Sequence, residues 1–220
     1  MTNSQKIFLV LGGTGRTGRH FVNKVLQEGH RVRLLVQNTK KVEYNNTNLN
    51  MELVQGSIID FENFDELVQD VDYIASMLGN AQLQKNENIN ANFVKKLMPA
   101  MRKHGVKRFL YQAGGLTRPY NQNLPFLMWI VKNTLARYYG LLGQHRDNET
   151  VLKYLVEKAQ DIEWIVHRAA LISDAPSKGT LIRSKTKTSM ATFVDCAHYN
   201  YRLLSDDTAI HTYDLSYYFK

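Results

Sequence analysis

Residues 7–18 of the chain read IFLVLGGTGRTG, and this stretch decides the fold. The apolar run Ile7–Val10 favours a β-strand, and the residues from Arg16 to Leu26 have the spacing of a helix. Glycines fill the turn between them. A strand, a tight turn and a helix in this order bring a helix N-terminus, with its unpaired backbone N–H groups, to the end of a sheet. The stretch therefore predicts a site for an anionic ligand.

The glycines have the spacing of a dinucleotide-binding turn. Gly13, Gly15 and Gly18 satisfy G-x-G-x-x-G, and Gly12 extends the pattern to G-x-x-G-x-x-G. Glycine lets a pyrophosphate approach the backbone without meeting a Cβ atom. A glycine-rich turn without a ligand is the alternative interpretation. The place of the turn, directly after the first strand and before the first helix, favours a dinucleotide.

Length and composition limit the class of protein. The chain has 220 residues, 44% of them hydrophobic, which suffices for one core and requires no second domain. The single Cys196 excludes an internal disulfide framework, and the N-terminus does not resemble a secretory signal. We therefore expect a reduced, cytoplasmic setting. The nearest candidate for a membrane span, Leu124–Val131, is far shorter than the roughly 18 residues required, so we expect a buried helix or a lid there.

The formal net charge of +8 raises the question of a nucleic-acid partner. The basic residues are scattered, apart from short clusters at 40–41, 102–103 and 183–187, and no nucleic-acid-binding motif accompanies them. A basic surface also suits a multiply phosphorylated cofactor. We therefore expect a small-molecule ligand rather than nucleic acid.

Strands and helices alternate along the chain. Apolar and β-branched runs predict strands at 7–10, 31–36, 51–55, 71–77, 107–113 and 162–167. Helical spacing predicts helices at 16–26, 61–68, 88–103, 126–142, 147–158 and 192–204. Alternation of this kind indicates an α/β fold with a doubly wound parallel sheet, Rossmann-like, in a single domain over residues 1–220. Ligands of such sheets bind at the carboxyl ends of the strands, and residues 114–220 are expected to build most of the substrate side.

Four segments, taken in chain order, resemble the atypical short-chain dehydrogenase/reductases, in particular the NAD(P)H-binding, NmrA-like group that includes flavin and biliverdin reductases. They are the glycine loop 12–18, GVKRF at 105–109, DIEWIVHR at 161–168 and DAPSKG at 174–179. The resemblance spans nearly the whole chain. It implies a Rossmann-like fold and a nicotinamide dinucleotide as cofactor.

The resemblance also implies which residues contact the cofactor. The implied contacts are Gly12, Thr14, Gly15, Arg16 and Thr17 at the diphosphate, Gln37 and Lys41 at the adenosine ribose, Ser57 and Ile58 at the adenine, Met77, Leu78 and Gly79 at the phosphates and ribose, and, further along the chain, Ala113, His145 and Leu171, the last bordering the nicotinamide.

The end of the second strand bears on the choice between the two coenzymes. An Asp or Glu there would accept a hydrogen bond from the 2′-hydroxyl of NAD and repel a 2′-phosphate, whereas this chain has Gln37 and Asn38, with Lys40 and Lys41 following. This pattern favours NADP(H) over NAD(H). The family often has an arginine in place of Gln37, and the two lysines also fit an ordinary solvated loop.

The proton-transfer pair of many short-chain dehydrogenases is missing. In that pair, Tyr-x-x-x-Lys, the lysine lowers the tyrosine pKa. Four residues after Tyr138 and Tyr139 stand Leu142 and Gly143, so no lysine is present, and Gln112–Gly115 replaces the family's serine after the fifth strand. A standard alcohol dehydrogenase reaction is thereby disfavoured.

Three residues remain as candidates for a catalytic role. The resemblance places His145 where the flavin reductases have a histidine at the cofactor; its neutral ring would donate a hydrogen bond, and its cation would supply a proton. Tyr111 and Thr117 carry hydroxyl groups near the end of the fifth strand. A polar cap for His145, and packing or turn roles for the other two, are the alternatives. We expect Arg168 to be structural.

Two further groups of residues have simpler explanations. The histidines show no metal-ligand spacing with carboxylates or with Cys196, so we expect no metal. The aromatic residues Phe126, Trp129, Tyr138 and Tyr139 have a spacing typical of core packing, although they would also suit a pocket for a planar ligand.

Three functions are compatible with these observations. The first is an NADPH-dependent oxidoreductase that transfers hydride to a planar or conjugated acceptor, such as a flavin, a quinone or an enone, because such acceptors need little acid catalysis. The second is a non-catalytic NADP(H) sensor that regulates a protein partner. The third is an NAD(P)-dependent isomerase or epimerase, which the missing tyrosine disfavours.

Overall fold

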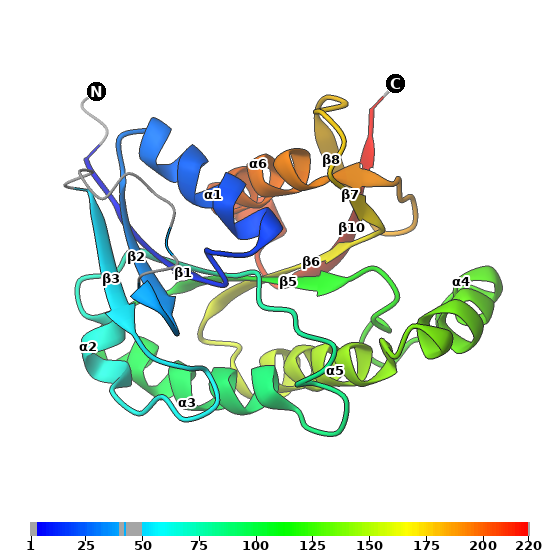
Figure 1. Ribbon diagram of the computed structural model, residues 1–220, viewed down its shortest axis with the longest axis horizontal. Coiled ribbons are helices and arrows are strands. Elements are labelled where there is room, and N and C mark those ends of the chain that lie inside the picture. The colour runs from blue at the N-terminus through cyan, green and yellow to red at the C-terminus, as the bar shows by residue number, and fades with distance from the viewer. Residues whose placement is uncertain (1–3, 40–41, 43–49, 220) are drawn as a thin grey trace.

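The computed structural model describes residues 4–39, 42 and 50–219 (Figure 1). In this part of the chain an eight-stranded sheet has the order β3-β2-β1-β4-β5-β6-β10-β8. Its strands are β1 (Ile7–Leu11), β2 (Arg31–Val36), β3 (Met51–Gln55), β4 (Tyr73–Ser76), β5 (Arg108–Gly114), β6 (Glu163–Ala169), β8 (Leu181–Ser184) and β10 (Thr212–Tyr218). A separate pair joins β7 (Ile172–Ser173) to β9 (Ala191–Thr192).

The sheet is parallel from β3 to β10, and only β8 pairs antiparallel, on the outer side of β10. The order reverses between β1 and β4, because the chain adds β2 and β3 on one side of β1 and β4 to β6 on the other. Open sheets of this topology bind ligands in the crevice at that reversal. The predicted Rossmann-like α/β fold with a doubly wound parallel sheet is confirmed.

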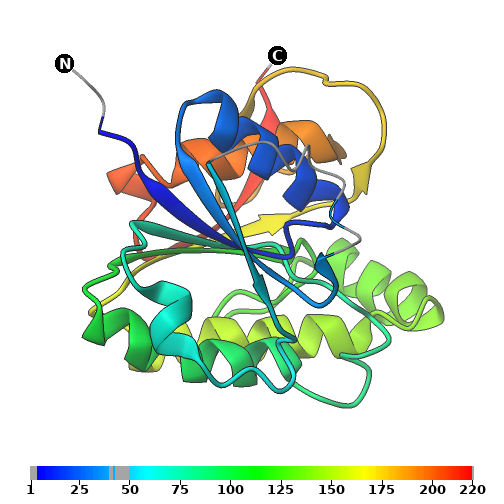
Figure 2. The same ribbon diagram turned by 60° about the vertical axis from the view of Figure 1, so that its left-hand side comes forward.

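Helices cover both faces of the sheet (Figure 2). On one face lie α1 (Arg16–Gln27) and α6 (Phe193–Leu203), and on the other lie α2 (Phe64–Val68), α3 (Ile89–Lys103) and α5 (Leu142–Lys158). Alternate residues of β1 point to the two layers: Phe8 and Val10 pack under α1, and Leu9 and Leu11 pack towards α3. The near-continuous apolar strands are buried on both sides for this reason.

The connection from β5 to α5 differs from the prediction. A helix was expected over 126–142 and another from Asp147, but α4 (Phe126–Val131) continues as a π-helix (Lys132–Ala136) and ends at Gly140, whose φ is +69°. The next helix, α5, already begins at Leu142. Glycine adopts this left-handed conformation without strain, so it lets one helix end and the next begin within two residues.

The aromatic residues of this connection are not part of the core, contrary to the prediction from their spacing. No side chain of α4 is buried, and Phe126, Trp129, Tyr138 and Tyr139 are 77%, 53%, 83% and 68% exposed. Figure 1 shows why: α4 extends away from the body of the molecule beyond the first turn of α5. Helical periodicity identified an apolar surface, but long-range packing decides whether that surface is covered.

The C-terminal part contains strands that the sequence did not reveal. The aromatic segment after residue 210 forms β10 between β6 and β8, and β7 to β9 lie along the chain between β6 and α6. Thr192 caps α6, its hydroxyl accepting a hydrogen bond from the Asp195 backbone N–H at 3.1 Å. None of the helices within the described ranges is long and apolar enough to cross a membrane.

Candidate functional site

The glycine loop is held together by contacts between backbone atoms. Gly12 has φ +80°, and a Cβ atom on it would lie 2.8 Å from the Met77 carbonyl oxygen. A Cβ atom on Gly18 would lie 2.1 Å from the Gly12 carbonyl oxygen. Because these neighbours are backbone atoms that cannot rotate away, only glycine allows the loop to pass so close to β4 and to α1. The Gly15 N–H donates to the Gly12 carbonyl at 3.0 Å and closes the turn.

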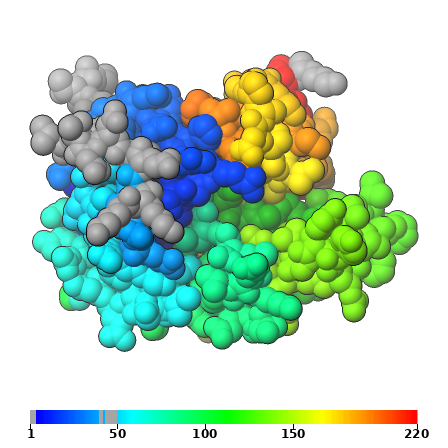
Figure 3. Space-filling view, viewed as in Figure 1, coloured from blue at the N-terminus to red at the C-terminus, as the bar shows by residue number. Residues whose placement is uncertain are grey.

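A cavity of about 810 Å³ lies at the carboxyl ends of β1, β2 and β4. It is lined by Gly12, Thr14, Gly15, Leu35, Val36, Gln37, Asn38, Gly56, Ile58, Met77, Leu78, Gly79, Asn80, Leu83, Gln84, Ile89 and Asn90. In Figure 3 the dark blue glycine loop and the sea-green segment after β4 face each other across it. None of these lining residues carries a charge, so an anionic ligand would meet glycine backbone and the N-terminus of α1.

Eight of the residues expected at the cofactor line this cavity: Gly12, Thr14, Gly15, Gln37, Ile58, Met77, Leu78 and Gly79. The others described, Arg16, Thr17, Ser57, Ala113, His145 and Leu171, are not part of its wall. Lys41 lies outside the described residues. The geometry thus brings together the loop, the end of β2 and the end of β4, which is the path that the sequence predicted for the dinucleotide.

Arg16 and Thr17 follow the glycine turn but point in other directions. The Arg16 guanidinium lies 4.4 Å from the centre of the Phe193 ring and 3.4 Å from Asp174, on the α6 side of the loop. Thr17 is buried, and its hydroxyl accepts a long hydrogen bond of 3.5 Å from Gln112 Nε2. Their expected contacts with a diphosphate stay predictions.

Thr17 is the end of a buried polar chain, which we call the relay: Ser216, His167, Asn200, Gln112 and Thr17. Asn200 Nδ2 donates to Gln112 at 2.7 Å, so Asn200 Oδ1 accepts from His167 Nδ1, also at 2.7 Å. His167 Nε2 then accepts from the Ser216 hydroxyl at 2.9 Å. Complete burial lowers the His167 pKa to about 4, so the ring is neutral and every bond in the relay has one direction.

At the other end of the cavity, the side chains after β2 and β3 contact each other. Gln37 Nε2 donates to the Ser57 hydroxyl at 3.3 Å, and the same hydroxyl accepts from the Ile59 N–H at 3.3 Å. The Ser57 hydroxyl is therefore hydrogen-bonded within the protein, while Gln37 and Asn38 line the cavity. No Asp or Glu stands among the lining residues at this end.

The segment after β4 supplies part of the wall that the sequence did not predict: Asn80, Leu83, Gln84, Ile89 and Asn90. It is fixed by Asp147 of α5, which is completely buried. The Asp147 carboxylate accepts from the N–H groups of Asn90 and Ala91, at 2.9 and 3.0 Å, and from Gln84 Nε2 at 2.8 Å. Asp147 therefore caps α3 from another helix. An acid in a helix that also carries several other charged residues gives no signal of this in the sequence.

Tyr111 is locked into the same region. Its hydroxyl accepts from Asn90 Nδ2 at 3.0 Å and donates to Asn148 Oδ1 at 2.6 Å, and the side chain is completely buried. Burial raises the Tyr111 pKa well above its usual value, and the nearby Asp147 charge raises it further. Tyr111 therefore holds its proton firmly, which disfavours its expected catalytic role and favours a positioning role for Asn90 and Asn148.

His145 lies against the end of β5. A Cβ atom on Gly114 would be 2.8 Å from its Cε1 atom, so glycine makes room for the ring. The ring is 6% exposed, and Nδ1 has no hydrogen-bond partner in the described part of the chain. Burial, reinforced by the charge of Lys132, lowers the His145 pKa to about 4. The lowered pKa favours a role for His145 as a neutral hydrogen-bond donor over a role as a cation that supplies a proton.

The remaining candidates are Thr117, which follows β5, and Leu171, which follows β6. Thr117 is buried; its hydroxyl accepts from Asn148 Nδ2 at 3.4 Å, and its carbonyl accepts from Arg168 Nη1 at 3.0 Å. Arg168 also donates to the Tyr213 carbonyl, so it ties the loop after β5 to β10, as its expected structural role requires. Leu171 is exposed.

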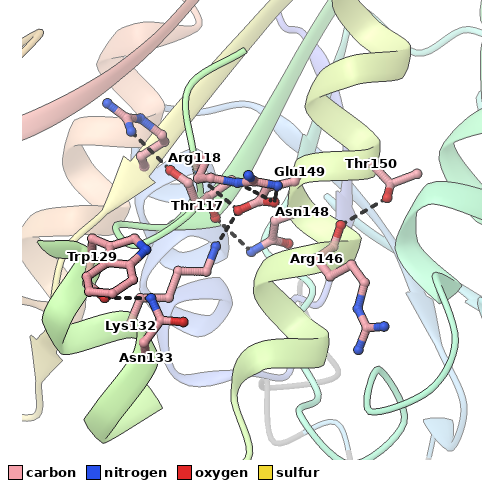
Figure 4. Close-up of polar contacts among 10 residues, drawn as sticks. Thr117, Arg118, Trp129, Lys132, Asn133, Arg146, Asn148, Glu149 and Thr150 are labelled. Atoms are coloured by element: carbon pink, nitrogen blue, oxygen red, sulfur yellow. Dashed lines mark hydrogen bonds and ion pairs between the residues drawn. The ribbon is translucent and has the colours of Figure 1, made fainter. Parts of the chain in front are cut away.

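An ion cluster links α4 to α5 (Figure 4). Glu149 of α5 accepts from the backbone N–H and the guanidinium of Arg118, at 2.9 to 3.0 Å, and from the Lys132 ammonium group. Burial opposes ionisation of Glu149, but these donors outweigh it and lower its pKa. No group of three or more His, Cys, Asp or Glu side chains suited to a metal ion occurs within the described ranges.

Comparison with known families gives one match over most of the chain. The family described as NAD(P)H-binding matches residues 12–207, from the glycine loop to the end of α6 and beyond. This range contains every residue that lines the cavity.

Two curated proteins are similar to part of the chain. A phenylcoumaran benzylic ether reductase of Populus trichocarpa is 30% identical over 104 residues, which are 42% of this chain and 34% of that protein. Pinoresinol reductase 2 of Arabidopsis thaliana is 32% identical over 116 residues, 49% of this chain and 36% of that protein. The matches thus cover about a third of the length of these relatives.

Solved structures with the same fold cover nearly the whole chain. The oxidoreductase ylbE of Lactococcus lactis has a TM-score of 0.75 at 16% identity, covering 97% of this chain and 91% of that one. An anaerobillin reductase of Escherichia coli has a TM-score of 0.74 at 13% identity, covering 96% and 95%. At these identities the likeness shows the fold.

Proposed function

Because this chain belongs to the NAD(P)H-binding family, we propose that it is an NADPH-dependent oxidoreductase that transfers hydride to a planar or conjugated small-molecule acceptor. The observation that carries the proposal is the uncharged, glycine-walled cavity at the reversal of strand order. The names of the similar plant proteins, both reductases of small molecules, agree with it.

The residues present fit a dinucleotide. Gly12 and Gly18, where a Cβ atom would meet neighbouring backbone, keep the loop tight, and the backbone N–H groups at the N-terminus of α1 bind the diphosphate. Gln37, Asn38 and Ile58 hold the adenosine end, and Met77 to Gly79 hold the part nearer to the reacting ring. When bound, the coenzyme supplies the hydride. The protein binds it, orients it and excludes water.

The groups near the end of β5 favour an acceptor that needs little help from an acid. Tyr111 keeps its proton between two amide partners, and His145 is neutral above about pH 4. The unpartnered Nδ1 of His145 is buried outside the cavity wall, so the hydrogen bond to the coenzyme that the resemblance implies would require the ring to move. A flavin, a quinone or an enone accepts hydride directly once it is oriented, so positioning provides most of the rate.

The preference for NADPH rests on the end of β2. A carboxylate at this position would repel a 2′-phosphate, and the wall here consists of Gln37 and Asn38. We assign Lys41 to the same phosphate as a prediction from the sequence. The single cysteine, Cys196, is buried and free, which agrees with the cytoplasmic setting that we propose.

The direct test is calorimetric titration of the protein with NADPH and, separately, with NADH, followed by mixing the NADPH complex with flavin, quinone and enone acceptors. We expect NADPH to bind more tightly, and its absorbance to decay with at least one acceptor class. Absence of association with either coenzyme would overturn the proposal.

A second function is favoured by the locked tyrosine and the neutral histidine. A non-catalytic NADP(H) sensor needs the same cavity but no proton donor, and it would act through a protein partner. Association with NADPH, without oxidation by any acceptor, and partner binding that changes with the coenzyme would identify it. Partner binding that is equal with and without nucleotide would exclude it.

A further inference from the structure

A second cavity lies between α4 and α5 and shares no residue with the dinucleotide cavity. Its volume is about 630 Å³. Its wall consists of Arg118, Asn123, Leu124, Phe126, Trp129, Lys132, Asn133, Leu142, Arg146 and Glu149. Figure 4 shows this region, with Arg118, Lys132 and Glu149 in contact and Arg146 pointing away from them.

The charges of this cavity do not cancel. The Glu149 carboxylate is shared by Arg118 and Lys132, so these three groups together carry one positive charge. The Arg146 side chain is exposed and forms no ion pair or hydrogen bond with the described residues. The wall therefore has a net charge of +2, and one of its guanidinium groups is free to bind a carboxylate, a sulfonate or a phosphate in two-point fashion.

The other half of the wall is apolar and aromatic. The rings of Phe126 and Trp129 lie 6.3 Å apart, centre to centre, with an angle of only 12° between their planes. Both are more than half exposed, although exposed aromatic side chains of this size are costly to leave in water. Leu124 and Leu142 add apolar surface beside them.

We propose that this cavity is a binding site for a small planar aromatic anion, distinct from the dinucleotide site. The aromatic part packs on Trp129 and Phe126, and the anionic group pairs with Arg146. The ion cluster at Glu149 holds α4 against α5. Because Lys132 and Arg118 are already paired with Glu149, Arg146 provides the main charge contact with the ligand. The proposal does not depend on the reductase assignment.

The test uses three probes of similar size and calorimetry on the full chain without coenzyme. 2-Naphthoate carries both features, 2-naphthalenemethanol lacks the charge, and decahydro-2-naphthoate lacks the aromatic rings. We expect 2-naphthoate to bind about tenfold more tightly than either of the others, because only it uses both halves of the wall. Equal affinity for naphthoate and its alcohol, or no heat with naphthoate, overturns the proposal.

Two matched arginine variants and one tryptophan variant locate the site. Arg146→Gln should weaken 2-naphthoate about tenfold and leave the alcohol unchanged. Arg137→Gln removes an exposed cation that precedes α5 and lies outside the cavity wall, and should change naphthoate affinity by less than about twofold. Trp129→Leu should weaken naphthoate and the alcohol alike. An equal loss of naphthoate affinity in the two arginine variants would show unspecific attraction to a basic surface and would overturn the proposal.

Discussion

The glycine loop after β1 and the first turns of α5 both lie at the carboxyl ends of the strands, but they are built in different ways. The loop depends on backbone atoms in close contact, as between Gly12 and Met77 or Gly12 and Gly18. The α5 region depends on side chains that meet from distant parts of the chain, as Asp147 meets the N-terminus of α3. A site built from backbone contacts tolerates many different side chains nearby but no added Cβ atom on its glycines. A site built from side-chain contacts loses its structure when one of the partners is replaced.

Among the single substitutions, the largest effect is expected from removing Asp147. Asp147→Ala leaves the N–H groups of Asn90 and Ala91 buried without an acceptor, so the free energy of unfolding should fall by about 3 kcal/mol. Urea unfolding measures it. Asp147→Asn, which keeps one acceptor oxygen, should lose less than the alanine variant. Equal losses in the two variants would mean that the cap contributes little.

The corresponding test of the loop is Gly15→Val. A Cβ atom on Gly15 would lie 3.2 Å from the Gly12 carbonyl, so the backbone must shift by only a few tenths of an ångström, but a branched side chain would occupy the space of the diphosphate. At NADPH concentrations about a hundred times the dissociation constant, we expect the wild type to gain about 2.7 kcal/mol and the variant to gain nothing. Thermal unfolding with and without NADPH measures the difference, and retention of the shift in the variant would contradict the proposed position of the diphosphate.

Acid should destabilise the protein through two buried histidines, His145 in α5 and His167 in the relay. The pKa values of His145 and His167 are about 4 in the folded protein against an ordinary 6.5, so below about pH 6.5 the unfolded state binds more protons. The contribution of these two histidines to the pH dependence should therefore vanish above about pH 6.5, where the free energy of unfolding is at its highest value. This free energy should fall towards pH 4 by about 1.4 kcal/mol per pH unit for each histidine.

His145→Gln and His167→Gln should each remove one of these two contributions from the pH dependence. Urea unfolding at about pH 7 and pH 5 tests this, with His20→Gln, an exposed histidine on α1, as the control. If the free energy of unfolding of the His145 or His167 variant depends on pH as strongly as that of the wild type, the replaced histidine is accessible to protons in the native state.

The smallest effect is expected at the ion cluster. Glu149→Gln keeps the shape but removes the charge that holds Lys132 and Arg118, and should cost about 1 kcal/mol. Because the cluster attaches α4 to α5, hydrogen exchange should accelerate in residues 126–139 and not in α3. Uniform acceleration in both would indicate a global loss of stability instead.

The same contrast explains how far the sequence could be interpreted. The glycine loop was predictable from a few neighbouring residues, and the parallel sheet from the alternation of strands and helices. The wall residues 37, 58 and 77–79 were implied by the family resemblance. The wall formed by residues 80–90 was not predictable, since Asp147 fixes it from 57 residues away. The exposure of Phe126 and Trp129 was predicted wrongly, because periodicity shows that a helix has an apolar face and not what covers it.

The relay from Ser216 to Thr17 has a consequence for how the molecule assembles. Its five members come from β10, β6, α6, β5 and α1, so no fragment of the chain can complete it. Until β10 has inserted between β6 and β8, His167 lacks its Ser216 partner in a dry interior. During synthesis on the ribosome, the nascent chain should therefore remain sensitive to protease until β10 has left the exit tunnel, and then become resistant in one step.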